Sequence, residues 1–228
     1  PLQGTDKWRE HYKDHPHPRD KYGAFISSMD EIIGKVVTHV EKLGLRENTI
    51  ILFQSDHGHS IETRTFGGGG SSGPYRGAKG SLFEGGIRVP SIVSWPGKIP
   101  QGEVRSQMAT GCDWFPTLAE FSGAKLPKNR KLDGKSLVDV ISNDKAASPH
   151  KSFYWQLGTQ SVVREGNWKL LLNPRDHNRP DGREPSGKVF LADLAEDPGE
   201  SKNLAKKNPE VVNRLSELRQ SYLNGLKK

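Results

Sequence analysis

Two ionisable side chains stand at the point where an apolar segment of the chain ends. Residues 50–54 read Ile-Ile-Leu-Phe-Gln and are followed by Ser55, Asp56, His57 and Gly58. A carboxylate suits a hard divalent cation such as calcium, whereas an imidazole alone would suggest zinc. The glycine lets the backbone turn, so that both side chains can converge on one ion. Asp-His-Gly also occurs after strands as a simple turn without a metal ion. The tripeptide alone is therefore compatible with a metal site and with a turn.

A second set of candidate side chains lies downstream in a loop without regular periodicity. Residues 75–90 place Arg76 and Lys79 among small residues, so the backbone can approach a ligand closely. Lys79 lies 23 positions after Asp56, near enough along the chain to return to the same strand end. A metal ion with a cation beside it is a receptor for a tetrahedral oxyanion such as sulfate or phosphate. A solvated loop is the alternative explanation of the two cations.

The elements that must position these residues are a long helix and a buried strand. Apolar residues recur at steps of three and four over residues 20–44, which predicts a helix with one broad apolar stripe. Residues 49–54 are apolar on both faces, as is typical of a central parallel strand covered by helices. Residues 91–95 predict a second buried strand. In open α/β sheets, ligands gather beyond the carboxyl ends of the strands, where the Asp-His pair lies.

The remainder of the chain predicts short helices and a small sheet. Residues 113–121 predict a helix with Asp113 as its N-cap and Pro116 in its first turn, and residues 136–141 predict another. Short β-prone runs separated by turn residues predict an antiparallel sheet, and these runs are residues 152–156, 160–164, 168–172 and 189–194. A final helix is predicted over residues 209–226.

Composition narrows the classes of partner. The 228 residues carry a formal net charge of +7, which suits anionic partners, but no nucleic-acid motif is present and nucleic acid is not expected. No apolar run approaches the roughly 20 residues of a membrane span. Cys112 is the single cysteine, so cysteine usage does not settle the compartment. The chain begins at Pro1 rather than Met, which indicates a piece of a longer protein.

Several short motifs follow one another in a fixed order: residues 55–58 (SDHG), 76–79 (RGAK), 84–90 (EGGIRVP), 95–97 (WPG), 113–118 (DWFPTL), 132–137 (LDGKSL), 163–170 (VREGNWKL) and 191–200 (LADLAEDPGE). With these motifs the chain resembles the C-terminal part of a type I sulfatase, in the alkaline phosphatase-like superfamily. The motifs span nearly the whole chain. Asp-His-Gly by itself would be a weak signal, whereas the ordered set is specific.

The resemblance implies a fold class and a reaction. It implies an α/β architecture with a central sheet flanked by helices, and the change of composition near residue 147 assigns residues 1–147 to the C-terminal part of that catalytic domain. Residues 148–228 would form a small α+β subdomain with an antiparallel sheet and a C-terminal helix. The implied enzyme is a sulfuric ester hydrolase that acts on a sulfated carbohydrate or an aryl sulfate, in the periplasm or outside the cell. A phosphodiesterase or phosphonate hydrolase of the same superfamily and a noncatalytic fragment that binds sulfated glycans stay open.

The resemblance also implies roles for individual residues. Asp56 and His57 would be the last two ligands of one calcium ion, with His57 where many members have Asn. Lys79 would contact the sulfate and take part in catalysis, and Arg76 and His59 could line the substrate pocket. The family's nucleophile, formylglycine, is made from a Cys or Ser in Cys/Ser-x-Pro/Ala-x-Arg. Cys112 does not match that motif and is expected to be a small buried residue, so formylglycine is expected in an N-terminal half that this chain lacks.

Overall fold

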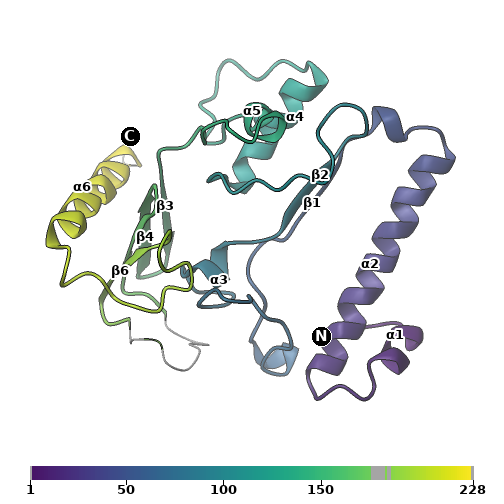
Figure 1. Ribbon diagram of the computed structural model, residues 1–228, viewed down its shortest axis with the longest axis horizontal. Helices are drawn as coiled ribbons and strands as arrows, with labels where there is room; N and C mark the ends of the chain where they lie inside the picture. The colour runs from purple at the N-terminus through teal and green to yellow at the C-terminus, as the bar shows by residue number, and fades with distance from the viewer. Residues whose placement is uncertain (1, 176–182, 184–185, 227–228) are drawn as a thin grey trace.

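The computed structural model describes residues 2–175, 183 and 186–226. The helices are α1 (Asp6–His11), α2 (Arg19–Lys42), α3 (Glu84–Ile87), α4 (Trp114–Ser122), α5 (Val138–Ser142) and α6 (Pro209–Gly225), with short 3-10 turns η1 (Arg46–Asn48), η2 (Thr63–Thr65) and η3 (Gly111–Asp113). The strands are β1 (Ile51–Gln54), β2 (Ser91–Ser94), β3 (Ser152–Leu157), β4 (Gln160–Glu165), β5 (Trp168–Leu172) and β6 (Val189–Asp193). Figure 1 shows α2 along one side of the molecule and the β3–β6 sheet with α6 on the other.

The predicted elements are largely confirmed, and so is the α/β class. The long helix, both strands around the Asp-His pair, the two short helices, the antiparallel sheet and the last helix all form within a few residues of their predicted bounds. Gly123 ends α4 with a φ of 71°, a left-handed conformation that glycine adopts without a steric penalty. Local sequence signals therefore fix most of the secondary structure.

The environment of β1 differs from the prediction. We expected a buried parallel strand, but β1 pairs with β2 in an antiparallel register that runs from Ile51 opposite Ser94 to Gln54 opposite Ser91. The apolar residues of β1 are only half-buried, and Ile92 of β2 is 61% exposed. An apolar run indicates that both faces of a strand can be buried. It does not indicate whether the neighbouring strand runs parallel or antiparallel, or which segment covers the faces.

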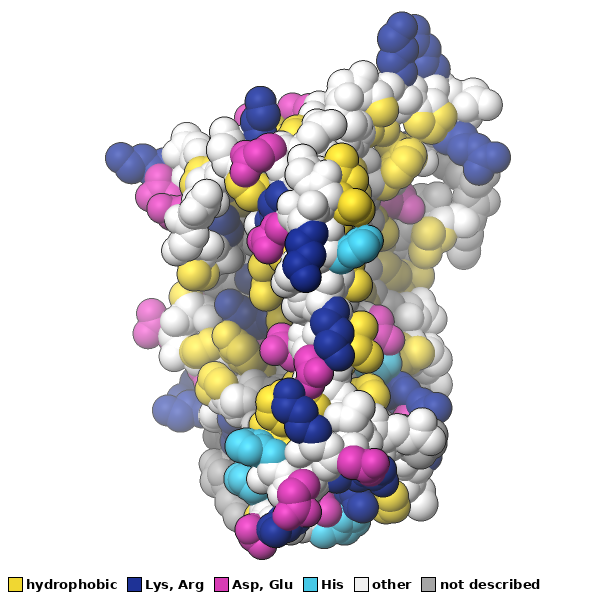
Figure 2. All heavy atoms as spheres, turned by 90° about the vertical axis from the view of Figure 1, so that its right-hand side faces the viewer, with side chains coloured by type: hydrophobic (Ala, Val, Ile, Leu, Met, Phe, Trp, Pro, Cys, Tyr) yellow, Lys and Arg dark blue, Asp and Glu magenta, His cyan; other side chains and the backbone are white. Residues whose placement is uncertain are grey.

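The apolar stripe of α2 is covered only near its start among the described residues. Ala24 and Ser28 are buried where Thr5 and α1 pack against the helix: Trp8 Nε1 donates to Glu31, and the backbone N–H of Thr5 donates to the Ser28 hydroxyl. Farther along, Ile32 and Val36 are each 59% exposed. Figure 2 looks onto this side and shows hydrophobic side chains among charged ones at the surface. No described helix combines the length and apolar character needed to cross a bilayer.

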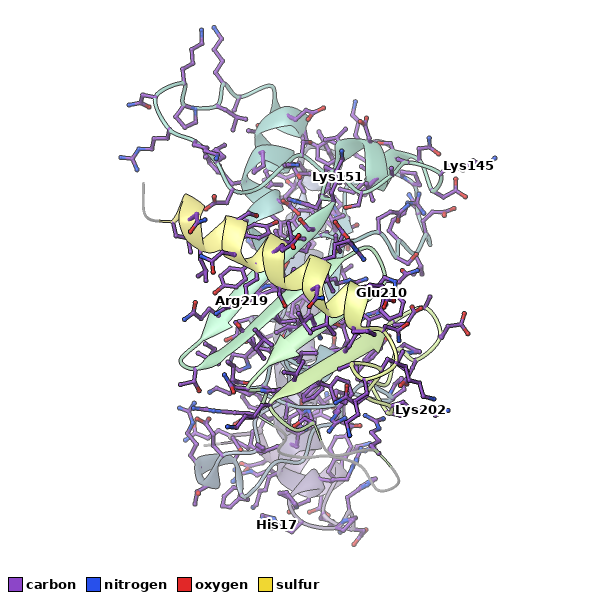
Figure 3. The ribbon with its side chains drawn as sticks, turned by 90° about the vertical axis from the view of Figure 1, so that its left-hand side faces the viewer. His17, Lys145, Lys151, Lys202, Glu210 and Arg219 are labelled. Atoms are coloured by element: carbon purple, nitrogen blue, oxygen red, sulfur yellow. The ribbon has the colours of Figure 1, made fainter. Side chains whose placement is uncertain are left out.

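The β3–β4–β5–β6 sheet is antiparallel throughout and is covered on both faces. Successive side chains of a strand point to opposite faces, so each strand contributes to two cores. The first core joins the sheet to the segment before α3 and consists of Leu82, Phe83, Val162, Leu171, Phe190, Ala192 and Leu194. The second joins it to α6, which crosses the sheet in Figure 3, and consists of Val163, Leu170, Leu191 and Leu215. The division of the chain at residue 147 stays a prediction.

The start of α4 differs from the prediction in two details. Asp113 is the N-cap residue as predicted, but its carboxylate makes no capping bond to α4; it accepts bonds from the backbone N–H of Thr110 and Lys135, each 2.8 Å long, and pairs with His150 Nε2 at 2.7 Å. The reason is that η3 precedes α4 and turns this carboxylate back toward Thr110. Cys112 is exposed rather than buried, because the same turn directs Asp113 inward.

Candidate functional site

Asp56 and His57 lie together in the turn that follows β1. The Nε2 atom of His57 is 3.0 Å from Oδ2 of Asp56, and the backbone N–H of His57 donates to Oδ1 of Asp56 over 3.0 Å. The hydroxyl of Ser55 donates to the carbonyl of His57 and closes the turn. The side chain of Asp56 is 81% exposed and that of His57 is 38% exposed. The two side chains therefore converge, and their oxygen and nitrogen atoms can be reached by a ligand.

Gly58 allows this turn to pack closely against α3. Its N–H donates to the carbonyl of Gly86 over 3.0 Å, and a Cβ atom at position 58 would overlap the carbonyl oxygen of Gly85. A glycine is needed here because the two backbones touch, rather than because of an unusual φ. The position of the Asp56–His57 pair is consequently set by α3.

Lys79 is tied to the same region by its backbone and its side chain. Its N–H donates to the carbonyl of His59 over 3.0 Å, and its ammonium donates to Oε2 of Glu62 over 2.9 Å. Glu62 also accepts a bond from Arg64. The bond from Lys79, followed by that from Arg64, lowers the pKa of the Glu62 carboxyl to about 2. No local sequence pattern indicates Glu62, because an acid in a polar loop has many possible partners.

His59 lies between the Asp56–His57 turn and the first part of α2. Burial lowers the pKa of its imidazole below the usual range, so the ring is neutral near pH 7. A Cβ atom at Gly70 would lie 2.6 Å from the Cβ of His59 and 2.9 Å from the Tyr22 hydroxyl oxygen. The close approach of this glycine packs the loop against both His59 and α2.

Arg76 occupies a different kind of position from Lys79. Its side chain is fully buried, its Nη1 atom donates to the carbonyl of Glu200 over 2.8 Å, and its guanidinium lies 4.3 Å from the ring centre of Phe83 and 4.9 Å from that of Phe190. These contacts join the loop to the β3–β6 sheet. The predicted contact between Arg76 and substrate is not supported by this position.

The donor atoms of the turn suit a calcium ion as part of its ligand set. Calcium in proteins takes about six to eight ligands, mostly oxygen, and Asp56 offers one carboxylate with His57 beside it. The described residues contain no group of three or more His, Cys, Asp or Glu side chains that could hold a metal ion.

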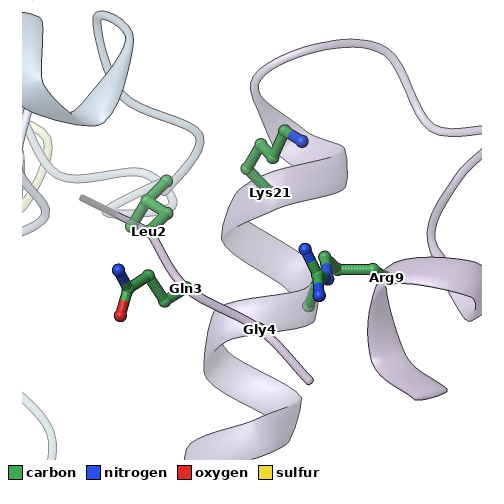
Figure 4. A pocket seen from close by; sticks show the side chains of 6 residues that line it. Leu2, Gln3, Gly4, Arg9 and Lys21 are labelled. Atoms are coloured by element: carbon green, nitrogen blue, oxygen red, sulfur yellow. The ribbon is translucent and has the colours of Figure 1, made fainter. Parts of the chain in front are cut away.

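Two hollows lie away from the Asp56–His57 turn. One of about 390 Å³ lies between the N-terminal segment and α2, and Figure 4 shows Gln3, Arg9 and Lys21 around it. A larger one of about 840 Å³ lies between the C-terminal end of α2 and β2, with Val37 and Trp95 among its lining residues. Neither is lined by a predicted site residue.

Comparisons with known proteins agree with the resemblance. The sequence model of the family described as Sulfatase matches residues 1–124, and the model described as N-sulphoglucosamine sulphohydrolase, C-terminal, matches residues 78–226. The steryl-sulfatase of Rattus norvegicus is 40% identical over 136 residues, which cover 58% of this chain and 24% of that protein.

Solved structures give the same result over a longer stretch. The crystal structure of Ps i-CgsB in complex with k-i-k-neocarrahexaose superposes with a TM-score of 0.80 and 25% identity, covering 97% of this chain and 47% of the other. That of BT4656 in complex with its substrate D-glucosamine-2-N,6-O-disulfate has a TM-score of 0.62 and 25% identity, covering 90% and 41%. The chain thus spans less than half the length of each of these proteins.

Proposed function

The chain belongs to the sulfatase family, and on that premise we propose that it supplies part of the active site of an enzyme that hydrolyses a sulfate ester. The observation that carries the proposal is the backbone bond from Lys79 to His59, two residues after the paired Asp56 and His57. It holds the backbone of Lys79 against the segment that directly follows a candidate metal-binding pair, while the Lys79 ammonium contacts Glu62. A metal ion and a lysine at one place can bind and neutralise the oxygen atoms of a sulfate group.

The family generally uses a metal ion and formylglycine, and we assign this chain's residues around them. Asp56 and His57 are two ligands of a calcium ion, Lys79 binds a sulfate oxygen, and neutral His59 lines the pocket. When bound, calcium would polarise the sulfate oxygens, and formylglycine would supply the nucleophile. Lys79 contributes by holding its positive charge next to the group that is transferred, since such positioned charges stabilise the transition state.

We propose that the other ligands and the formylglycine belong to an N-terminal half of the same protein. Exposed apolar side chains support this partner. Ile32 and Val36 of α2 and Ile92 of β2 are each 59–61% exposed, and the larger hollow lies between α2 and β2. A segment that covered these side chains would remove apolar surface from water, which favours packing.

The proposed substrate is a sulfated carbohydrate or an aryl sulfate. The net charge of +7 suits an anionic substrate, and BT4656, similar to this chain in fold, is described with a disulfated glucosamine as its substrate. We also propose a periplasmic or secreted location, which cell fractionation of the natural host would test.

Turnover of a sulfate ester by the complete natural protein tests the proposal. Asp56→Ala should abolish turnover and Lys79→Ala should reduce it severely, because each removes a group that contacts the metal or the sulfate. Asp6→Ala and Lys13→Ala are matched controls, since each side chain forms an exposed ion pair with a residue three positions away and its loss should leave turnover unchanged.

Three outcomes would contradict the proposal. Full activity in both Asp56→Ala and Lys79→Ala would show that neither residue has the role assigned to it. Faster hydrolysis of a phosphonate or phosphate diester than of any sulfate ester would favour the other hydrolases of the superfamily. Salt-sensitive binding of sulfated glycans, without hydrolysis and without a calcium requirement, would indicate a noncatalytic module.

A further inference from the structure

A buried ionic cluster lies between α3 and the β3–β6 sheet, and we define it as Glu84, Lys169 and Glu200. The ammonium of Lys169 is 2.8 Å from Oε1 of Glu84 and 3.0 Å from Oε1 of Glu200. Oε2 of Glu200 accepts a 2.6 Å bond from the backbone N–H of Glu84. The three side chains are at most 2% exposed. The cluster therefore forms a closed set of contacts without solvent.

The strand pattern explains how a lysine reaches this position. Lys169 precedes Leu170 in β5, so it points to the face that Leu171 shares and away from α6. Its cross-strand neighbours on this face are Arg164 of β4 and Ala192 of β6, and the small side chain of Ala192 leaves room for the lysine. An apolar residue would satisfy the same alternation at lower desolvation cost, so hydrophobic burial does not account for the lysine.

The surrounding charges define the state of the cluster. Burial by itself raises the pKa of Glu84, but Lys169, Arg164 and Arg88 together hold it below the usual range. Both arginines lie 3.7 Å from Oε2 of Glu84. Burial raises the pKa of Glu200, and the charge of Glu84 adds to this effect. Glu84, whose pKa is lowered, thus meets Lys169 as a carboxylate, and it is the first residue of α3.

From α3 the contacts run to both parts of the candidate site. Gly86 accepts the backbone bond from Gly58, which follows the Asp56–His57 pair. Gly85 donates a 2.6 Å bond to the carbonyl of Arg76, three residues before Lys79. A Cβ atom at Gly85 would overlap the carbonyl of residue 77, so α3 fits tightly against this loop as well.

We propose that Lys169 and Glu200 are positioning residues that hold α3 in place and thereby set the Asp56–His57 pair against Lys79. They touch neither metal nor substrate in this proposal, which rests on the proposed function. Losing the cluster would let α3 shift, and the two parts of the site would shift relative to each other. Small displacements of this kind can cost about 100-fold in rate.

The test is calcium titration and steady-state kinetics of the complete natural protein carrying Lys169→Met. We expect calcium to bind about 10- to 100-fold more weakly, as for residues that orient metal ligands, together with a fall in kcat larger than the change in KM. Circular dichroism establishes first that the variant is folded. Glu200→Gln is the milder variant, because an amide oxygen can still accept from the Glu84 N–H. Lys169→Arg, which restores the charge, should recover part of the calcium affinity.

Arg214→Met is the matched control. Arg214 pairs with Glu165 at the surface, and the pair joins β4 to α6 on the opposite face of the sheet. It should leave calcium affinity and kcat unchanged. Normal calcium affinity and kcat in folded Lys169→Met and Glu200→Gln, beside an active wild type, would overturn the positioning role alone. A wild type that neither binds calcium nor hydrolyses sulfate esters would overturn the proposed function and this inference with it.

Discussion

Two groups of charged side chains in the described part of the molecule are built from similar residues in opposite surroundings. The exposed cluster consists of Asp56, His57, Glu62 and Lys79, with side chains 25–81% exposed. The buried cluster consists of Glu84, Lys169 and Glu200, at most 2% exposed. Exposed ion pairs contribute little to stability and can exchange partners, whereas a buried charge must keep its partner. Burial thus separates groups available to a ligand from groups that hold the fold.

The largest expected effect is on stability, in the buried cluster. Lys169→Met removes the cation from two buried carboxylates and should lower the free energy of unfolding by about 3–5 kcal/mol. Urea denaturation followed by circular dichroism measures this change. A loss below about 1 kcal/mol would contradict the larger contribution to stability that we assign to the buried cluster.

The opposite pattern is expected for Asp56→Ala. In calcium-free buffer its free energy of unfolding should stay within about 0.5 kcal/mol of the wild type, because the side chain is 81% exposed. Calcium should raise the melting temperature of the wild type but not that of the variant. Equal stabilisation of both proteins by calcium would show that the ion binds elsewhere.

A smaller effect is expected for Glu62→Gln. The carboxylate of Glu62 holds the Lys79 ammonium at 2.9 Å, and under the proposed function it would compete with an incoming sulfate. Neutralising it should strengthen inhibition by free sulfate about two- to fivefold, in the range of exposed ion pairs. Glu10→Gln, which removes the partner of Lys13, is the control and should change nothing. Weaker sulfate inhibition in Glu62→Gln would show that Glu62 aids binding by orienting Lys79.

The smallest effect concerns pH. The pKa of Glu62 is lowered to about 2, chiefly by Lys79, so the folded protein binds this proton less readily than the unfolded chain. Its contribution to stability is present above pH about 4.3 and is lost as the pH falls toward 2. Carboxyl titration by NMR measures the value. Lys79→Met should raise the pKa of Glu62, and an unchanged titration would contradict the pairing.

The sequence predicts one of these clusters much better than the other. Asp56, His57 and Lys79 lie in short motifs, so a local pattern indicates them. The buried cluster joins residues that are 85 and 116 positions apart along the chain, and no local pattern indicates such pairs. Strand alternation in residues 168–172 puts Lys169 on the same face of the sheet as Leu171. This pattern is the one local indication that Lys169 is buried.

The same distinction explains what the local sequence does not indicate. Arg76 lies in a motif, and its place in a substrate pocket stays a prediction; Phe83 and Phe190 bury it through tertiary contacts that its neighbours in sequence do not reveal. The antiparallel partner of β1 was missed because an apolar strand of four residues has no directional signal. The β3–β6 sheet was predicted well because alternation and turn residues are both local.

The most direct test of the central claim is the calcium dependence of sulfate release by the complete natural protein. An aryl sulfate is supplied before and after removal of calcium with a chelator, and again after calcium is restored. We predict that turnover is lost and then recovered in the wild type, and is absent throughout in Asp56→Ala. Turnover that persists without calcium, or that Asp56→Ala retains, would contradict the assignment of the Asp56–His57 pair as metal ligands.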